Sequence, residues 1–143
     1  MSTTPTPPLE TDRCPCGSGD TFGACCGPVL SQQRRAATAQ ALMRSRYTAF
    51  ATGDLEHLLR SWHPGTRPDR EDLAASLEED VRWLRLVIHE TSAGGPFDDA
   101  GTVEFTAISR SPGGRQVLRE LSRFVREGGA WLYVDGDVAR DPG

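Results

Sequence analysis

Four cysteines within thirteen residues are the part of the sequence with the clearest chemistry. They follow the spacing Cys-x-Cys, eight residues, then Cys-Cys, at Cys14, Cys16, Cys25 and Cys26. Each pair can present two thiolates to one ion, and the loop between the pairs is long enough to complete the tetrahedral site that zinc prefers. Four thiolates leave no open coordination position, so we expect one structural Zn²⁺ per chain and not a catalytic metal.

Other uses of clustered cysteines remain open at this point. Two disulfides would require a strained vicinal bond between Cys25 and Cys26. A redox dithiol or an iron-sulfur cluster is a further alternative, but the spacing matches neither of the usual ferredoxin patterns. Gly17 and Gly27 directly follow the two pairs, and glycine can adopt the positive φ angles of a tight turn around a metal. We therefore favour zinc.

The composition on either side of the cysteines predicts how the chain is divided. Residues 1–12 are rich in Thr and Pro, which predicts a disordered lead-in. Residues 13–28 form the expected zinc module, residues 29–137 the main domain, and residues 138–143 a tail. Because the main domain has its own apolar core, we expect Cys25→Ser to melt residues 13–28 and leave the main domain folded.

Three helices are expected in the first half of the main domain. The first covers about residues 38–52, where Gly53 suits its C-terminal end and Asp54 suits the N-cap of the second helix. The second helix stops by Pro64, and Asp69 is the expected N-cap of the third. The apolar face of the first helix consists of Ala39, Met43, Tyr47 and Phe50.

Four strands are expected in the second half. Residues 82–91 alternate, which predicts Leu84, Leu86 and Ile88 on one face and Trp83, Arg85, Val87 and His89 on the other. Three further strands are expected over residues 102–109, 115–126 and 130–136, joined by glycine-containing turns. Helices followed by an antiparallel meander indicate an α+β fold, with the helices packed on one face of the sheet.

Several sequence blocks resemble known families. Cys14-Pro-Cys-Gly-Ser-Gly, Phe22 and Cys25-Cys26-Gly27 resemble the SEC-C motif, a zinc module found in the SecA translocation ATPase. Four later blocks resemble the YchJ-like family of small bacterial proteins: Leu42-Met-Arg-Ser-Arg-Tyr-Thr-Ala-Phe50, Trp62-His-Pro64, Leu121-Ser-Arg-Phe124 and Trp131-Leu-Tyr-Val-Asp-Gly136. The resemblance implies a cone-shaped nuclear transport factor 2-like domain behind a zinc knuckle, in a family without an established activity.

Cones of this type leave a pocket at their wide end, which directs attention to polar and aromatic side chains of the main domain. The candidate pocket residues are Tyr47, Trp62, His63, Trp83, His89, Glu104 and Glu120. A buried carboxylate among them would be a candidate general base with a raised pKa. The alternative is structural. His63 would bond carbonyls at a helix end, His89 would face solvent, the tryptophans would fill the core, and each glutamate would pair with an arginine such as Arg46, Arg119 or Arg123.

The distribution of charge restricts the classes of partner. The formal net charge is -4, which argues against general nucleic-acid binding. No Asp or Glu occurs from Thr21 to Gly53. This stretch contains a possible interaction patch of Arg34, Arg35, Arg44 and Arg46. No apolar run approaches the roughly 18 residues of a membrane helix, and no signal-peptide pattern occurs, so we expect a cytoplasmic protein without membrane contact.

Two functions of different classes follow from these features. We expect a non-enzymatic zinc-binding adaptor whose knuckle presents a docking surface to another protein. The alternative is a small-molecule binding or isomerase/hydrolase-like domain that uses a pocket inside the cone. No nucleophile-base pair, phosphate loop or catalytic metal triad can be identified in the sequence, which favours the first function.

Overall fold

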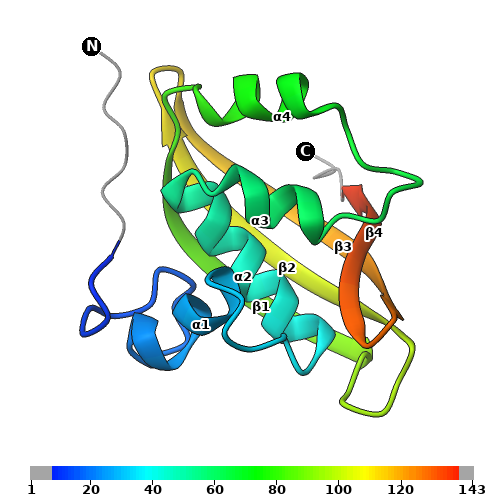
Figure 1. The fold of residues 1–143 in the computed structure, drawn as a ribbon. Helices are drawn as coiled ribbons and strands as arrows, with labels where there is room; N and C mark the ends of the chain where they lie inside the picture. Colours follow the sequence, from blue (N-terminus) through cyan, green and yellow to red (C-terminus); the bar gives the residue numbers. More distant parts are fainter. Residues whose placement is uncertain (1–7, 139–143) are drawn as a thin grey trace.

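The main domain is a four-stranded antiparallel sheet with helices on one of its faces (Figure 1). The computed structural model describes residues 8–138. The strands are β1 (Arg82–Ala93), β2 (Ala100–Ser111), β3 (Gly114–Glu127) and β4 (Ala130–Val138), in the order β1-β2-β3-β4. The predicted meander is thus confirmed. Most of the predicted lead-in and tail, residues 1–7 and 139–143, lies outside the described residues.

The end of the first helix at Gly53 and the N-cap of the second at Asp54 lie where the sequence predicted them. In α2 (Ala39–Thr52), the Thr38 side chain accepts a hydrogen bond from the Ala41 amide, and Gly53 ends the helix with φ 77°. In α3 (Leu55–Arg60), the Asp54 side chain accepts from the His57 amide. The helix α4 (Arg70–Leu77) follows Asp69, whose side chain makes no capping bond. The second helix ends at Arg60, earlier than Pro64, because the chain turns at Ser61.

A β-bulge in β1 changes which of its side chains face the core. The register shifts between Trp83 and Arg85, so Leu84 is the extra residue. Trp83 and Leu86 consequently pack on the same core cluster, while Leu84 is 46% exposed. The predicted placement of Leu84 with Leu86, and of Trp83 on the opposite face, is therefore wrong.

The core lies between α2 and the inner face of the sheet. Leu42 and Tyr47 from α2 belong to one buried cluster with Val103 and Phe105 of β2 and Phe124 of β3. A second, smaller cluster of Ala49, Leu58 and Leu73 joins the helices to one another. Because α2 contacts β1, β2 and β4, it is the element that aligns the rest of the domain.

The cysteine module packs on this domain beside α2 (Figure 1). It contains a 3₁₀ turn, η1 (Phe22–Ala24), and the short helix α1 (Cys26–Leu30), and Arg13 forms a β-bridge to Thr21. Residues 9–12, which the sequence grouped with the disordered lead-in, form a turn that holds this module. The Asp12 carbonyl accepts from the Phe22 amide at 2.8 Å, and the Glu10 carbonyl accepts from the Gly23 amide at 3.0 Å.

Candidate metal centre and its surroundings

The four cysteine side chains converge on one point. All four Sγ atoms lie within 4.8 Å of one another. The Sγ atoms of Cys16 and Cys25 are 3.6 Å apart, and those of Cys25 and Cys26 are 3.9 Å apart. A tetrahedral site with Zn–S bonds of about 2.3 Å has sulfur–sulfur edges of about 3.8 Å. These residues therefore fit a tetrahedral metal ion with four sulfur ligands.

The proximity of the thiols shifts their pKa values in opposite directions. The pKa of Cys14 is raised to about 11, mainly by its hydrogen bond with Cys16. The pKa of Cys26 is raised, mainly by its hydrogen bonds with Cys14 and Cys16, and the pKa of Cys16 is lowered because those neighbours donate to its thiolate. Four thiolates can thus coexist here only when a cation offsets their mutual repulsion.

Groups from the main domain surround the sulfur cluster. Arg44 of α2 donates from Nη1 to the Cys16 carbonyl oxygen at 3.1 Å and lies 3.8 Å from the Cys16 Sγ. The Thr48 hydroxyl of the same helix lies 3.9 Å from the Cys14 Sγ. On the outer side, the Ser18 hydroxyl lies 3.2 Å from the Cys25 Sγ. Such contacts orient the metal ligands and stabilise the negative charge on their sulfur atoms.

The inner and outer sides of the cluster differ in exposure. Cys14, Cys16 and Cys26 are buried and belong to the same core cluster as Leu42 and Tyr47, whereas Cys25 is only partly buried. The candidate centre is consequently closed toward the domain and approaches the surface at Cys25.

A groove lies directly beside Cys25 and Cys26, between the cysteine module and α2. It has a volume of about 340 Å³, and its lining includes Arg34, Arg35 and Arg44. Three of the four arginines of the predicted interaction patch therefore gather at one place. The fourth does not. Arg46 is 3% exposed and points into the domain, because that position of α2 faces the core.

Comparison with known proteins agrees with both parts of this architecture. Residues 38–136 match the family described as YchJ, middle NTF2-like domain, and residues 11–28 match the SEC-C motif. The chain belongs to the YchJ-like family. It is 48% identical over 133 residues to the UPF0225 protein SCO1677 of Streptomyces coelicolor, which covers 93% of this chain and 97% of that protein.

Solved structures support the same fold for this YchJ-like protein. The solution structure of RPA3114, a SEC-C motif containing protein from Rhodopseudomonas palustris, is 38% identical, has a TM-score of 0.79 and covers 89% of this chain and 98% of that one. An uncharacterized protein with a cystatin-like fold from Caulobacter vibrioides, 18% identical, has a TM-score of 0.52, with coverage of 72% and 88%. The predicted nuclear transport factor 2-like fold and SEC-C module are confirmed.

The candidate pocket residues of the YchJ-like domain do not converge. His89 and Glu104 lie on the outer face of the sheet, where the His89 Nε2 is 2.6 Å from the Thr106 hydroxyl and Arg119 pairs with Glu104 at 2.7 Å. The predicted ion pair of Glu104 is confirmed. Tyr47 is buried in the core. Burial raises the pKa of Tyr47 to about 12, and Trp83 packs edge-on against its ring.

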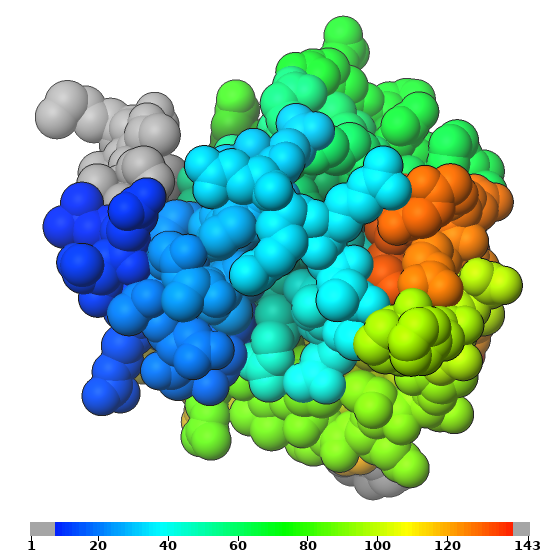
Figure 2. Space-filling view, turned by 60° about the horizontal axis from the view of Figure 1, so that its bottom comes forward, coloured from blue at the N-terminus to red at the C-terminus, as the bar shows by residue number. Residues whose placement is uncertain are grey.

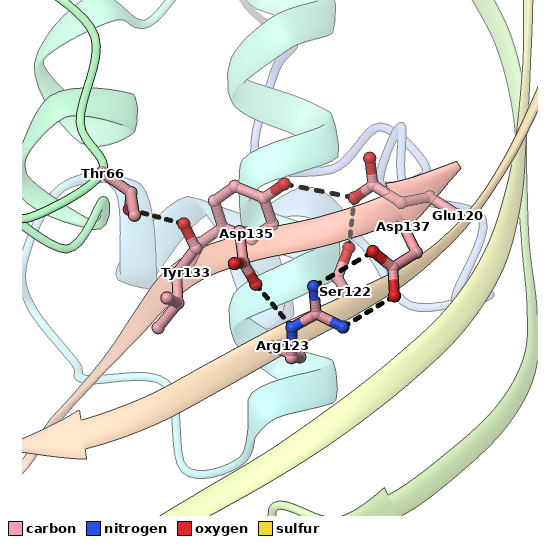
Figure 3. A network of polar contacts seen from close by, with 8 residues as sticks. Thr66, Glu120, Ser122, Arg123, Tyr133, Asp135 and Asp137 are labelled. Carbon is pink, nitrogen blue, oxygen red and sulfur yellow. Dashed lines mark hydrogen bonds and ion pairs between the residues drawn. The ribbon is translucent and has the colours of Figure 1, made fainter.

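Glu120 belongs to a polar network in the middle of β3, opposite the C-terminal end of β4 (Figure 3). Its carboxylate accepts from the Ser122 hydroxyl and from the Tyr133 hydroxyl, the latter at 3.3 Å. Nearby, Arg123 pairs with Asp135 and Asp137 instead. Within the described residues Glu120 forms no ion pair, so the prediction of an arginine partner is wrong for this glutamate.

His63 and Trp62 lie at the end of α3. The His63 Nδ1 accepts from the Gly65 amide at 3.0 Å, and its Nε2 lies 3.3 Å from a carboxylate oxygen of Glu127. Its ring therefore bonds no helix carbonyl, contrary to the prediction. Trp62 packs edge-on against Tyr133, and its buried Nε1 has no hydrogen-bond partner among the described residues.

Arg46 performs the role that was predicted for His63. It donates from Nη1 to the Leu58 carbonyl at 3.0 Å and to the Ser61 hydroxyl at 2.7 Å. Its guanidinium carbon lies 4.6 Å from the ring centroids of both Trp62 and Tyr133. Burial lowers the pKa of Arg46 to about 10. The residue is thus a buried cation held by aromatic faces and carbonyl groups.

His57, the most deeply buried histidine, was not among the predicted site residues. It is 3% exposed, and its Nε2 lies 2.8 Å from the Ser45 hydroxyl. Its Nδ1 lies 3.2 Å from Nη2 of Arg60. The sequence carries no signal for this burial, because His57 lies outside the apolar positions Leu55, Leu58, Leu59 and Trp62 of its segment.

Proposed function

We propose that this protein is a zinc-binding adaptor whose cysteine module docks another protein. The observation that supports the proposal is the cluster of four sulfur atoms at tetrahedral spacing, closed toward the core and reaching the surface at Cys25. A site with four thiolate ligands leaves no position for a substrate, so its role is structural. We retain a cytoplasmic location as part of this proposal, because four reduced thiols require a reducing compartment.

Zinc would supply a cross-link between two short segments that have little secondary structure of their own. Cys14 and Cys16 follow the β-bridge residue Arg13, and Cys25 and Cys26 lie where η1 meets α1. When bound, the ion would connect these segments and fix the surface between them. No step of catalysis is assigned to it.

The alternative function, a ligand pocket inside the cone, receives little support from the positions of its residues. The groove beside Cys25 includes none of the seven candidate pocket residues. A wider hollow of about 760 Å³ between α3 and α4 includes none of them either.

No helix among the described residues is long and apolar enough to cross a membrane.

Native mass spectrometry with elemental analysis tests the metal part of the proposal. One zinc per chain, lost with a strong chelator and absent from Cys25→Ser, is the expected result. A protein with no metal and a mass lower by two hydrogens per disulfide would contradict it.

Site-specific photo-crosslinking in cells tests the adaptor part. A crosslinkable residue at Ala24, exposed in the cysteine module, should capture a protein partner, whereas the same residue at Val117, which is 62% exposed on the sheet, should not. Equal capture at both positions, or none at Ala24, would remove the docking role even if zinc is present.

A further inference from the structure

The groove between the cysteine module and α2 is lined by both arginines and small apolar residues. The apolar lining includes Ala36 and Ala41, while Arg34, Arg35 and Arg44 contribute the guanidinium groups. Figure 2 shows the two segments side by side, the cysteine module in blue and the start of α2 in cyan. A volume of about 340 Å³ is at the small end of the roughly 300–1,000 Å³ typical of ligand sites.

The three arginines have no carboxylate partner among the described residues. Each instead donates to a backbone carbonyl oxygen: Arg34 to Cys25, Arg35 to Gly128 and Arg44 to Cys16, all at 3.1 Å. One carboxylate, that of Asp20, lines the groove. A guanidinium group has five N–H donors, so each arginine retains donors for a carboxylate.

Two of these arginines are held by metal-ligating residues. Arg34 donates to the carbonyl of Cys25 and Arg44 to the carbonyl of Cys16. Cys25 and Cys26 themselves form part of the groove wall. Loss of the metal would release these carbonyls, and with them the positions of both guanidinium groups.

We propose that this groove binds an acidic segment of a partner protein, and that bound zinc holds the groove in shape. The proposal rests on the adaptor function above and names the chemistry of its partner. Arginine pairs with carboxylates in a bidentate geometry, and the small alanine side chains leave room for an extended chain. The negative charge of a zinc–thiolate centre is mostly buried, whereas Arg34 and Arg35 are exposed, so an approaching carboxylate meets the arginines first.

A nucleic acid fits the groove less well than a peptide. The chain carries a formal net charge of -4, which repels a long polyanion. None of the residues that line the groove is aromatic, and single-stranded nucleic acids are bound largely through base stacking on aromatic side chains. A short acidic segment interacts only with the local charge, because salt screens charges farther away than about 8–10 Å.

Fluorescence anisotropy with the zinc-loaded full chain tests the proposal. The probe is a fluorescein-labelled peptide of four Glu-Ala repeats, and its control is the same peptide with Gln in place of Glu. The double variant Arg34→Gln/Arg35→Gln should weaken binding of the Glu-Ala probe by at least about tenfold, because two charge-assisted contacts are lost. The matched variant Arg82→Gln/Arg115→Gln, on the sheet, should change binding less than about threefold. Removal of zinc should abolish binding, and its return should restore it.

Several outcomes would overturn the proposal. Equal losses in both double variants would mean nonspecific attraction, and a larger loss in the sheet variant would place the acidic probe on the sheet. Equal binding of the Gln-Ala peptide would exclude recognition of charge. Displacement of the probe by inorganic phosphate as readily as by unlabelled Glu-Ala peptide would indicate a small-anion site. If the zinc-free protein binds as well as the loaded one, the metal does not shape the groove. A partner crosslinked at Ala24 despite a failed peptide titration would retain the adaptor function and reject only the acidic chemistry.

Discussion

At the scale of single residues, the buried polar groups of the helical layer form chains of hydrogen bonds with defined directions. The Ser45 hydroxyl donates its one hydrogen to the Leu42 carbonyl at 2.7 Å, so toward His57 it can act only as an acceptor. The His57 Nε2 must then carry the proton, and its Nδ1 accepts from Arg60. This arrangement requires a neutral imidazole, since a proton on Nδ1 would face the Arg60 guanidinium.

The neutral state of His57 predicts a loss of stability in weak acid. Burial, together with the charges of Arg60 and Arg46, lowers the pKa of His57 to about 3, from an ordinary value of about 6.5. Between these values the unfolded chain binds a proton that the folded chain does not, so stability is complete above pH 6.5 and falls as the pH is lowered. At pH 5.5 we expect a loss of about 1.4 kcal/mol from this residue alone.

Urea denaturation of wild type, His57→Gln and His89→Gln at pH 7.5 and 5.5 measures this effect. The difference in unfolding free energy between wild type and His57→Gln should narrow by about 1.4 kcal/mol at the lower pH. For His89→Gln, at an exposed position on the sheet, the difference in unfolding free energy from wild type should be the same at both pH values. If His57→Gln does not fold, NMR titration of wild type gives the answer directly, because a His57 ring that titrates near pH 6.5 contradicts the prediction.

Arg46 predicts a large cost for removal of a buried cation. In Arg46→Ala, the Leu58 carbonyl and the Ser61 hydroxyl lose their donor, and the rings of Trp62 and Tyr133 lose the group between them. We expect a loss of about 3 kcal/mol in unfolding free energy, against less than about 0.5 kcal/mol for Arg115→Ala on the surface. Similar values for both variants in chemical denaturation would contradict this assignment.

The residue scale also shows which assignments the sequence allows. The four cysteines could be identified because metal ligation imposes a short, local spacing that appears in the chain itself. Arg46 and His57 could not, because their roles depend on neighbours from other elements, and arginine is rarely fully buried. The sequence grouped Arg46 with Arg34, Arg35 and Arg44, whereas the Arg46 side chain packs on Trp62 and Tyr133 inside the domain.

At the scale of elements, period and capping predicted the helices and strands well, and the bulge at Leu84 in β1 marks where such reasoning stops. Alternation assumes one residue per pleat, but the extra residue Leu84 inverts the faces on one side of it. The residue types in residues 82–91 do not predict this bulge. It becomes necessary only when Trp83 and Leu86 must both reach the core under α2.

Three arginines are aligned across the sheet, and the sequence of one strand alone cannot predict this alignment. Arg82, Arg110 and Arg115 are directly opposite one another on β1, β2 and β3, and all three are exposed. None of them forms an ion pair within residues 8–138. Like charges at opposed positions of an antiparallel sheet repel.

Replacing the middle member of this row should stabilise the protein. Arg110→Thr removes both repulsions and introduces a residue that favours strands, so we expect a gain of about 0.5 kcal/mol in unfolding free energy at low salt. The gain should shrink as salt rises, because screening weakens the repulsion in wild type. Thermal denaturation at two salt concentrations measures both effects, with Arg67→Thr as the control outside the sheet. A loss of stability at low salt would contradict the prediction, because it would mean that other interactions of Arg110 outweigh its repulsion from Arg82 and Arg115.

At the scale of the whole molecule, the boundary between the cysteine module and the main domain is less complete than composition suggests. The chain divides clearly in sequence, since glycine, proline and cysteine give way to helical periodicity. In space, however, Cys14, Cys16 and Cys26 share the core cluster of Leu42 and Tyr47, and residues 9–12 hold the module from its other side. Three-dimensional contacts of this kind cannot be deduced from a change in composition.

This shared core leads to a prediction for metal removal that differs from independent melting of residues 13–28. Loss of the metal frees thiols that cover one side of α2, and α2 aligns the whole sheet. We therefore expect the zinc-loaded chain to unfold in one transition, whose midpoint falls by roughly 10 °C or more after chelation. Cys25→Ser should melt at the chelated midpoint and should not respond to chelator. Calorimetry decides between the two pictures, because independent modules would leave the main transition of the domain unmoved when zinc is removed.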